Sequence, residues 1–381
     1  MLVLSLTGFE PKGNSEASLD LPTGLSHRPR DESVVTSLCM NDPQPKGHMA
    51  SYIRRRKFLA SLGGAAAWPL AARAQQREGV RRIGVLIGVA DDAETKGWVA
   101  TFRKRLDELG WRAGDNLQIE ERWTAGDPDR NRRFAGELLA VRPDAIFAFS
   151  SVAVAALQQE SGTVPIVFTA ISDPVGSGFV ESLARPGRNA TGFTNFVPTM
   201  AAKWLEVLKE IAPQVRRAVL LYNPQTAPYV AEYYQRPFEA AAPSFGVQAI
   251  AVLVRQTAEI EAAIGDLARE PGGGLVVPPD SFSYVHRELI FTLAARHRVP
   301  AVYPFRFMAR EGGLVSYGVD LGETFPRAAE YIDRILKGTR PDALPVQAPT
   351  NFELAINLKT AKAIGLDVPA SLLARADEVI E

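Results

Sequence analysis

Short polar side chains follow several of the strand-like runs in this chain, at positions where they could bind a solute. Ser150 and Ser151 come directly after the apolar run DAIFAF, and Ser172 and Asp173 come after PIVFTAI. In open α/β sheets, ligands collect outside the carboxyl ends of the strands, where helix N-termini offer free N–H groups to a carboxylate or phosphate. A protein carboxylate at the same edge could pair with an amino group. The pattern therefore predicts a cleft for a small solute that carries both charges.

Further strand ends add hydroxyls, carboxylates and aromatic rings to the same predicted cleft. Aromatic rings could hold a flat group between them. Plainer interpretations stay open, because Ser150 and Ser281 could be helix caps and Asp173-Pro174 could be a turn. The predicted ligand-binding residues are Ser150, Ser151, Ser172, Asp173, Asn195, Asn223, Tyr229, Asp280, Ser281, Tyr303, Tyr317 and Asp320.

The chain lacks the common catalytic signatures. It contains no G-x-S-x-G elbow, no Walker A loop and no H-E-x-x-H motif. The neighbouring Glu120 and Glu121 fall on a predicted strand and would point to opposite faces, which makes them a poor acid–base pair. The one cysteine is Cys39. His286 and His297 are eleven residues apart on one predicted helix, and this spacing is wider than that of typical zinc ligands. We therefore predict no enzyme, no cofactor and no metal site.

Apolar strand-like runs alternate with amphipathic helices from residue 81 onward. One of these helices opens with Asp127 as its N-cap and Pro128 in its first turn. Strands that alternate with helices predict a parallel sheet covered on both faces. The predicted apolar face of the first helix is Trp98, Phe102, Leu106 and Leu109, and that of the second is Phe134, Leu138 and Val141.

The same order of elements restarts after residue 198. RRAVLLYN repeats RRIGVLIG after about 135 residues, GGLVVPPD repeats DAIFAFSS after about 130, and PAVYPF repeats PIVFTA after about 135. Chance similarity between hydrophobic strands is the alternative, but three matches at nearly one offset favour two similar lobes. We predict an α/β fold of two doubly wound parallel-sheet lobes joined by a hinge that the chain crosses several times. The predicted lobe 1 is 80–195 with about 320–342, and the predicted lobe 2 is 196–319 with about 343–381.

Residues 49–74 have the layout of an export signal. Arg54–Lys57 supply positive charge, Phe58–Ala72 is an apolar run, and Ala72-Arg73-Ala74 is a plausible cleavage site. The segment RRKFL resembles the twin-arginine pattern, and an ordinary Sec signal is the alternative. Because the apolar run is shorter than a bilayer span needs, we predict cleavage before Gln75 and no stable membrane insertion. The predicted location is the periplasm.

The composition on either side of this signal limits the partners. Residues 1–48 are crowded with Pro, Gly, Ser and Asp, which predicts a disordered extension or a misplaced start. Residues 75–381 carry 37 Asp and Glu against 34 Lys and Arg. A chain without a basic excess is not expected to bind nucleic acid or an anionic membrane.

From Arg54 to Glu381 the chain resembles the substrate-binding proteins of ABC transporters in the group related to tryptophan and tyrosine uptake. The resemblance rests on PIVFTAISDPVGSGFVESLARPGRNATGFTNF, WLEVLKEIAP, VPPDSFSYVHRELI and AINLKTAKAIGLDVPASLLARADEVIE, of which SDPVGSGFVESLARPG is the most specific part. It implies a type I periplasmic binding fold. It also implies that a small-molecule solute is clamped between the lobes and presented to an ABC permease in the inner membrane.

The resemblance implies ligand contacts as well. Many relatives have Thr-Pro-Ala in the loop after the third strand, where this chain has Ser150-Ser151-Val152, and this loop touches the ligand. The expected solute is amino-acid-like, and aromatic amino acids, branched-chain amino acids, amides and small aromatic acids all stay open. A secreted enzyme on the same fold and a sensory solute-binding ectodomain are the alternative functions. The implied contacts are Ser150, Ser151, Ser172 and Asp173 on one lobe and Asn223, Tyr229, Asp280 and Ser281 on the other.

Overall fold

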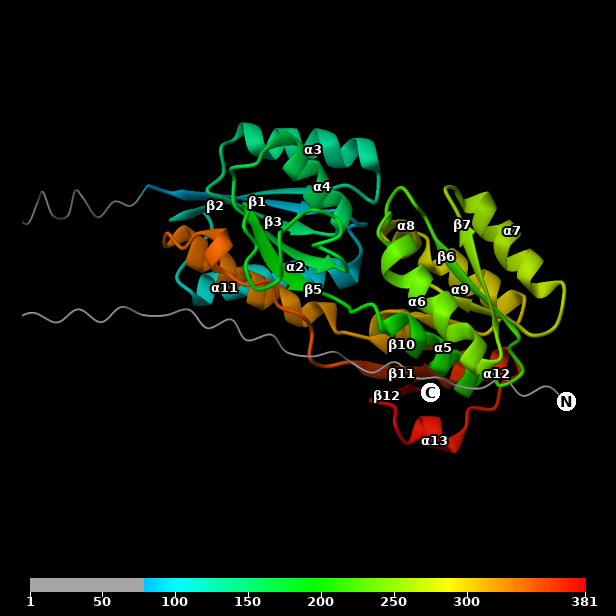
Figure 1. Ribbon diagram of the computed structural model, residues 1–381. Helices are drawn as coiled ribbons and strands as arrows, with labels where there is room; N and C mark the ends of the chain where they lie inside the picture. Colours follow the sequence, from blue (N-terminus) through cyan, green and yellow to red (C-terminus); the bar gives the residue numbers. More distant parts are fainter. Residues whose placement is uncertain (1–78) are drawn as a thin grey trace, which may run out of the picture. The chain divides into compact units, whose positions relative to one another are not determined.

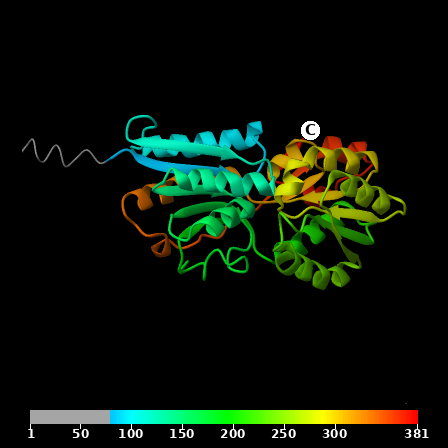
Figure 2. The ribbon, with the colours of Figure 1, turned by 90° about the horizontal axis from the view of Figure 1, so that it is seen from above.

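The computed structural model describes residues 79–381 (Figure 1). All of these residues belong to one compact unit. The predicted extension, 1–48, and the predicted export signal, 49–74, lie outside the described residues. Within 79–381, two parallel sheets with helices on both faces form two lobes (Figures 1 and 2).

The sheet of lobe 1 has five parallel strands in the order β2-β1-β3-β4-β5. Helices α3 and α4 contact each other on one face of this sheet, and α2 and α11 contact each other on the opposite face. The strands are β1 (Arg81–Ile87), β2 (Leu117–Trp123), β3 (Ala145–Phe149), β4 (Ile166–Ile171) and β5 (Ala190–Thr194). The helices are α2 (Ala93–Glu108), α3 (Pro128–Ala140), α4 (Ser151–Glu160) and α11 (Thr324–Leu336).

The sheet of lobe 2 repeats this order and then extends it. Its strands run β7-β6-β8-β9-β10, which matches β2-β1-β3-β4-β5 position by position, followed by an antiparallel β11 and then β12. The strands are β6 (Arg217–Tyr222), β7 (Gln248–Leu253), β8 (Gly273–Val276), β9 (Ala301–Tyr303), β10 (Val315–Gly318), β11 (Glu353–Asn357) and β12 (Glu378–Ile380). The α-helices are α5 (Met200–Ile211), α6 (Arg236–Ala241), α7 (Thr257–Ala268), α8 (Ser281–Val285), α9 (Arg287–Arg296), α10 (Arg306–Arg310), α12 (Leu358–Ala363) and α13 (Ala370–Leu373).

The equal strand order explains the sequence repeat, because both lobes bury strands that are covered on two faces and are therefore apolar throughout. Strand β3, for example, has all five of its residues buried. The prediction of an α/β fold with two doubly wound parallel-sheet lobes is confirmed. The antiparallel β11 is the one departure from a purely parallel arrangement among the described strands.

The chain passes between the lobes three times. It leaves lobe 1 after β5, returns after β10 to form α11, and leaves again to form β11. Before the last passage, Gln347 pairs with Phe193 of β5. The segment around Gln347 therefore stays with lobe 1 until just before the crossing. Three adjacent crossings provide a hinge about which the lobes can close.

A local sequence signal places the start of α3. Asp127 accepts hydrogen bonds from the N–H groups of Asp129 and Arg130 as the N-cap of α3, as predicted. The predicted apolar face of α3 is wrong in detail, because Phe134 and Val141 are only partly buried. A neighbouring face is buried instead, and it consists of Asn131, Ala135 and Leu138. The two histidines also do not share a helix, since His286 precedes α9 and His297 follows it.

Candidate functional site

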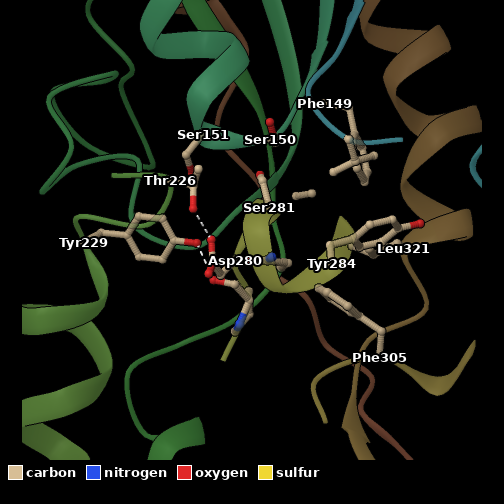
Figure 3. Close-up of a pocket in the computed structure, with 14 residues that line it drawn as sticks. Phe149, Ser150, Ser151, Thr226, Tyr229, Asp280, Ser281, Tyr284, Phe305 and Leu321 are labelled. Carbon is tan, nitrogen blue, oxygen red and sulfur yellow. Dashed lines mark hydrogen bonds between the residues drawn. The ribbon is translucent and has the colours of Figure 1, made fainter. Parts of the chain in front are cut away.

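The carboxyl ends of the strands in both lobes meet at an interlobe cleft with two compartments. The inner compartment is a cavity of about 30 Å³ (Figure 3). Small-molecule sites usually measure roughly 300–1,000 Å³, so in this conformation the lobes are drawn tightly together around it. Its walls are formed by Val89, Phe149, Ser150, Ser151, Ala170, Asn195, Thr226, Tyr229, Pro279, Asp280, Ser281, Tyr284, Phe305 and Leu321.

Lobe 1 contributes two free hydroxyl groups to this cavity. Ser150 and Ser151 lie where β3 ends and α4 begins, and they are only 5% and 7% exposed. Neither Oγ has a hydrogen-bond partner, and the side chain of Ser151 points toward Thr226 of lobe 2 in Figure 3. A buried hydroxyl without a partner loses its hydrogen bonds to water and is destabilising. The pair is therefore suited to bind a polar group of a solute.

The backbone at Ser150 is held in an unusual conformation. Its φ is 94°, in the left-handed region that costs a residue other than glycine about 1–3 kcal/mol. The N–H of Gly88 donates to the carbonyl of Phe149 at 2.9 Å and fixes the turn from behind. Glycine suits position 88, because a Cβ there would lie 2.9 Å from the backbone oxygen of Phe149 and would displace the Ser150 hydroxyl. Since Ser150 makes no side-chain cap, the first N–H groups of α4 remain available beside the hydroxyls.

Lobe 2 presents Asp280, whose carboxylate organises its own side of the cavity. Asp280 is the N-cap of α8 and accepts from the N–H groups of Phe282 at 3.0 Å and Ser283 at 3.4 Å. It also accepts from the N–H of Asn223 at 2.9 Å and from the hydroxyls of Ser283 and Thr226. Burial raises the pKa of Asp280, and these donors oppose part of that rise. Its visible role is to hold the loop after β6 against α8.

Tyr229 closes one side of the cavity. Its hydroxyl donates to the carbonyl of Pro279 at 2.7 Å. Burial raises the pKa of Tyr229 well above its usual value, and the nearby charge of Asp280 adds to the rise. The phenol is therefore neutral, and its ring is a fixed wall. Two other predicted residues support the site from behind: Ser172 is fully buried and donates to Asn195 Oδ1 at 3.1 Å, and Asn195 lines the cavity.

The outer compartment adjoins the inner one and measures about 380 Å³. Ser151, Thr226 and Tyr229 line both compartments. The predicted Asp173 lies here, where one of its oxygens accepts from the N–H of Gly176 at 2.7 Å and stabilises the loop after β4. The remaining walls come from Val152, Ala155, Gly176, Ser177, Phe179, Gln225, Pro228 and Glu232.

Direct contacts between the lobes flank the inner compartment. We call Asp92 and Thr95 of lobe 1 with Tyr284 and Arg287 of lobe 2 the interlobe latch. The hydroxyls of Thr95 and Tyr284 lie 2.8 Å apart, and Arg287 pairs with Asp92 at 2.9 Å. Arg287 is held by Glu311 of its own lobe at 2.6 Å. The latch stabilises the closed arrangement of the lobes.

Replacing Tyr284 by Phe is expected to shift the unliganded protein toward an open form. The substitution leaves the buried hydroxyl of Thr95 without its partner, which costs the closed form about 1–3 kcal/mol. Small-angle X-ray scattering should then give a larger radius of gyration than for the wild type. Tyr222→Phe is the matched control, because Tyr222 bonds only to Gln235 within lobe 2. Equal radii for both variants would contradict the role of the latch.

Three predicted site residues lie away from both compartments. Tyr303 is buried and its ring packs edge-on against Phe291 of α9. Tyr317 stacks on Phe352 at the outer face of lobe 2. Asp320 caps the 3-10 helix Leu321–Glu323 and pairs with Arg306 at 2.7 Å. Asn223 lines neither compartment, although it supports Asp280.

Several cavity residues were not predicted from the sequence. Phe149 and Leu321 each sit one position from a predicted residue, so a search of strand ends for apolar residues could have found them. Tyr284 lies inside α8 and carries no sequence signal of its own. The cavity residues outside the predicted ligand-binding set are Val89, Phe149, Ala170, Thr226, Pro279, Tyr284, Phe305 and Leu321.

Comparisons with known proteins assign this chain to a family. A sequence profile described as ABC transporter substrate binding protein matches residues 82–380. The chain belongs to this family. The substrate-binding protein is thus a binding protein rather than an enzyme, and the secreted-enzyme alternative is excluded. Within residues 79–381 no cluster of three or more His, Cys, Asp or Glu could hold a metal ion, and no helix is both long and apolar enough to cross a membrane.

Individual proteins are similar to this chain in sequence or in fold. A tyrosine-binding protein of Clostridioides difficile is 24% identical over 265 residues, which cover 70% of this chain and 75% of the relative. The ABC domain of a Streptococcus pneumonia protein in complex with L-Trp has a TM-score of 0.73 at 24% identity and covers 79% of this chain and 100% of its own. A conserved domain protein of Vibrio cholerae gives a TM-score of 0.73 at 25% identity, with the same coverage.

Proposed function

We propose that this substrate-binding protein clamps a small amino-acid-like solute between its lobes and presents it to the permease of an ABC importer. The observation that carries the proposal is the pair of buried, unpartnered hydroxyls of Ser150 and Ser151 at the N-terminus of α4. The partial positive charge of a helix N-terminus and its free N–H groups favour a carboxylate. The cleft also contains two acidic side chains, Asp173 and Asp280, and its negative charge favours the cationic part of such a solute.

The aromatic walls and the relatives bear on the rest of the solute. Phe149, Tyr284 and Phe305 line the inner compartment, and rings of this kind bind flat apolar groups. The relatives named above are a tyrosine-binding protein and a domain in complex with L-Trp. An aromatic amino acid is therefore a natural first candidate, with branched-chain amino acids, amides and aromatic acids beside it.

Binding requires the lobes to open and close about the hinge. A cavity of about 30 Å³ does not admit an amino acid while the lobes are closed. The solute enters an open form and shifts the population toward a closed, loaded form, which the permease recognises. Delivery to the periplasm by a twin-arginine or Sec signal within residues 49–74 belongs to the same proposal and concerns residues outside those described.

The first experiment is thermal unfolding of the purified protein against a panel of amino acids, amides and aromatic acids. A solute at 1,000 times its dissociation constant stabilises the folded state by about 4 kcal/mol, which raises the midpoint by several degrees. One sharp hit supports a receptor and gives its solute class. No shift with any member of the panel would contradict an amino-acid-like solute.

Removing either free hydroxyl is expected to weaken binding of the hit by about 10- to 100-fold. Each serine would contribute a hydrogen bond to a charged group of the solute, worth roughly 1.5–3 kcal/mol. Titration calorimetry on Ser150→Ala and Ser151→Ala measures the loss. Ser244→Ala is the matched control, because this exposed serine bonds only to the carbonyl of Ala241. Unchanged affinity in both site variants would rule out the helix terminus as the binding point.

A further inference from the structure

The two compartments of the cleft differ in size, and this difference assigns parts of the solute to them. The inner compartment measures about 30 Å³ and the outer about 380 Å³. Only the outer one is large enough for the body of a solute in the closed form. Ser151 lies at their junction, and its unpartnered hydroxyl is more than nine-tenths buried. A solute whose carboxylate binds at Ser150 and Ser151 must therefore extend into the outer compartment.

The walls of the outer compartment are apolar along their length and acidic at two points. Val152, Ala155 and Phe179 of lobe 1 face Pro228 and Tyr229 of lobe 2. Asp173 comes from lobe 1, and Glu232 comes from the π-helix Ala231–Gln235 of lobe 2. The carboxylates thus approach from opposite lobes.

No basic side chain balances these two carboxylates inside the cleft. Among the described residues that line either compartment there is no Lys, Arg or His. Glu232 pairs with Arg236 at 2.7 Å, but both side chains are largely exposed, and such surface pairs are worth little. Burial raises the pKa of Tyr233 in lobe 2, and the negative charge of Asp173 raises it further. The charge of Asp173 therefore acts across the cleft.

We infer that the solute carries a cationic group at the end remote from its carboxylate, held in the outer compartment between Asp173 and Glu232. This inference rests on the proposed function and changes the expected side chain from neutral to basic. The apolar walls bind the methylene stem, and Tyr229, which lines the same compartment, supplies an aromatic ring for a cation–π contact. Closure brings Glu232 toward Asp173, so a cationic solute stabilises the closed form more than a neutral one does.

Two pairs of amino acids test the charge with little change in shape. L-Arginine and L-citrulline differ in a guanidinium against a neutral urea, and L-lysine and L-norleucine differ in the ammonium group. Calorimetry on the purified protein should show the charged member of each pair binding at least tenfold tighter. L-Tryptophan is included as a neutral aromatic probe. Equal or weaker binding of the charged members would overturn the inference.

Variants of the two carboxylates locate the effect. Asp173→Asn and Glu232→Gln should each reduce the arginine-to-citrulline affinity ratio at least threefold, and the double variant should bring it close to one. Glu261→Gln is the matched control, because Glu261 is an exposed glutamate on α7 of the same lobe as Glu232. If tryptophan binds tightly and neither variant changes its affinity, the proposed function is supported and the inference of a basic group on the solute is wrong. Failure of all five amino acids to bind would contradict the inference, whereas the proposed function is contradicted only if the wider panel also gives no shift.

Discussion

Replacing Asp280 by Ala is expected to lower the free energy of unfolding by about 3–5 kcal/mol, because a buried hydrogen-bonded charge network loses its centre. Three backbone N–H groups and two hydroxyls donate to this carboxylate. Without it, these donors are left unpaired beside the cavity, and the loop after β6 is no longer held to α8. Urea unfolding at neutral pH measures the loss. Solute binding should fall with it, since Thr226 and Tyr229 line both compartments from this loop.

The matched substitution Asp280→Asn should recover only part of the stability. Each oxygen of Asp280 accepts from at least one backbone N–H, so an amide must turn its own NH₂ group toward a donor. Asp266→Asn is the control at an exposed carboxylate on α7, which pairs with Arg269, and it should change the stability by less than about 0.5 kcal/mol. Wild-type stability of Asp280→Ala would show that the donors find other partners.

The fold could be predicted from the sequence wherever a strand is buried on both faces. β3 and β8 are short apolar runs because helices cover both faces of each sheet. Corresponding strands of the two lobes are separated by a nearly constant number of residues, which makes the repeat visible in the sequence. The tail of the chain carries no such signal. The pairing of Gln347 with Phe193 and the antiparallel approach of β11 to β10 depend on which surface the chain meets after each crossing.

A site residue could be predicted where its position relative to a strand fixes its place in the fold. Ser150 and Ser151 follow a buried strand immediately, so their place at the carboxyl end of the sheet is fixed by β3 itself. Tyr303 also ends a strand, but successive residues of a strand point to opposite faces, and its ring turns toward α9. A sequence of three residues, as in β9, does not reveal which face is which.

The part played by each acidic residue could not be read from residue type. Asp280 and Asp173 both follow apolar runs and both precede a turn. Both oxygens of Asp280 accept hydrogen bonds within its own lobe, whereas Asp173 accepts one from the N–H of Gly176 and lines the outer compartment. The difference depends on the loop that approaches from β6, and this loop is distant in sequence from both.

Replacing Gly192 by Ala is expected to cost about 3 kcal/mol or more of unfolding free energy, because the added Cβ meets backbone that cannot move aside. Gly192 lies in β5 with φ at 153°, and a Cβ there would be 2.0 Å from the carbonyl oxygen of Phe168 in β4. The carbonyl of Gly192 also accepts from the N–H of Gln347 at 2.9 Å. The substitution therefore strains β4, β5 and the segment beside the third crossing together.

The same chemical change at Gly136 should have the opposite sign. Gly136 lies in the middle of α3, and a Cβ there meets nothing within 4 Å, so alanine should stabilise the helix by about 0.5–1 kcal/mol. Denaturant unfolding of the two variants under one condition makes the comparison, and similar shifts would contradict the close approach of β5 to β4. Since Asn195 lines the cavity only three residues after Gly192, calorimetry on the folded fraction of Gly192→Ala should also show weaker solute binding. A loss of stability with unchanged affinity would mean that β5 takes up the strain before it affects the cleft.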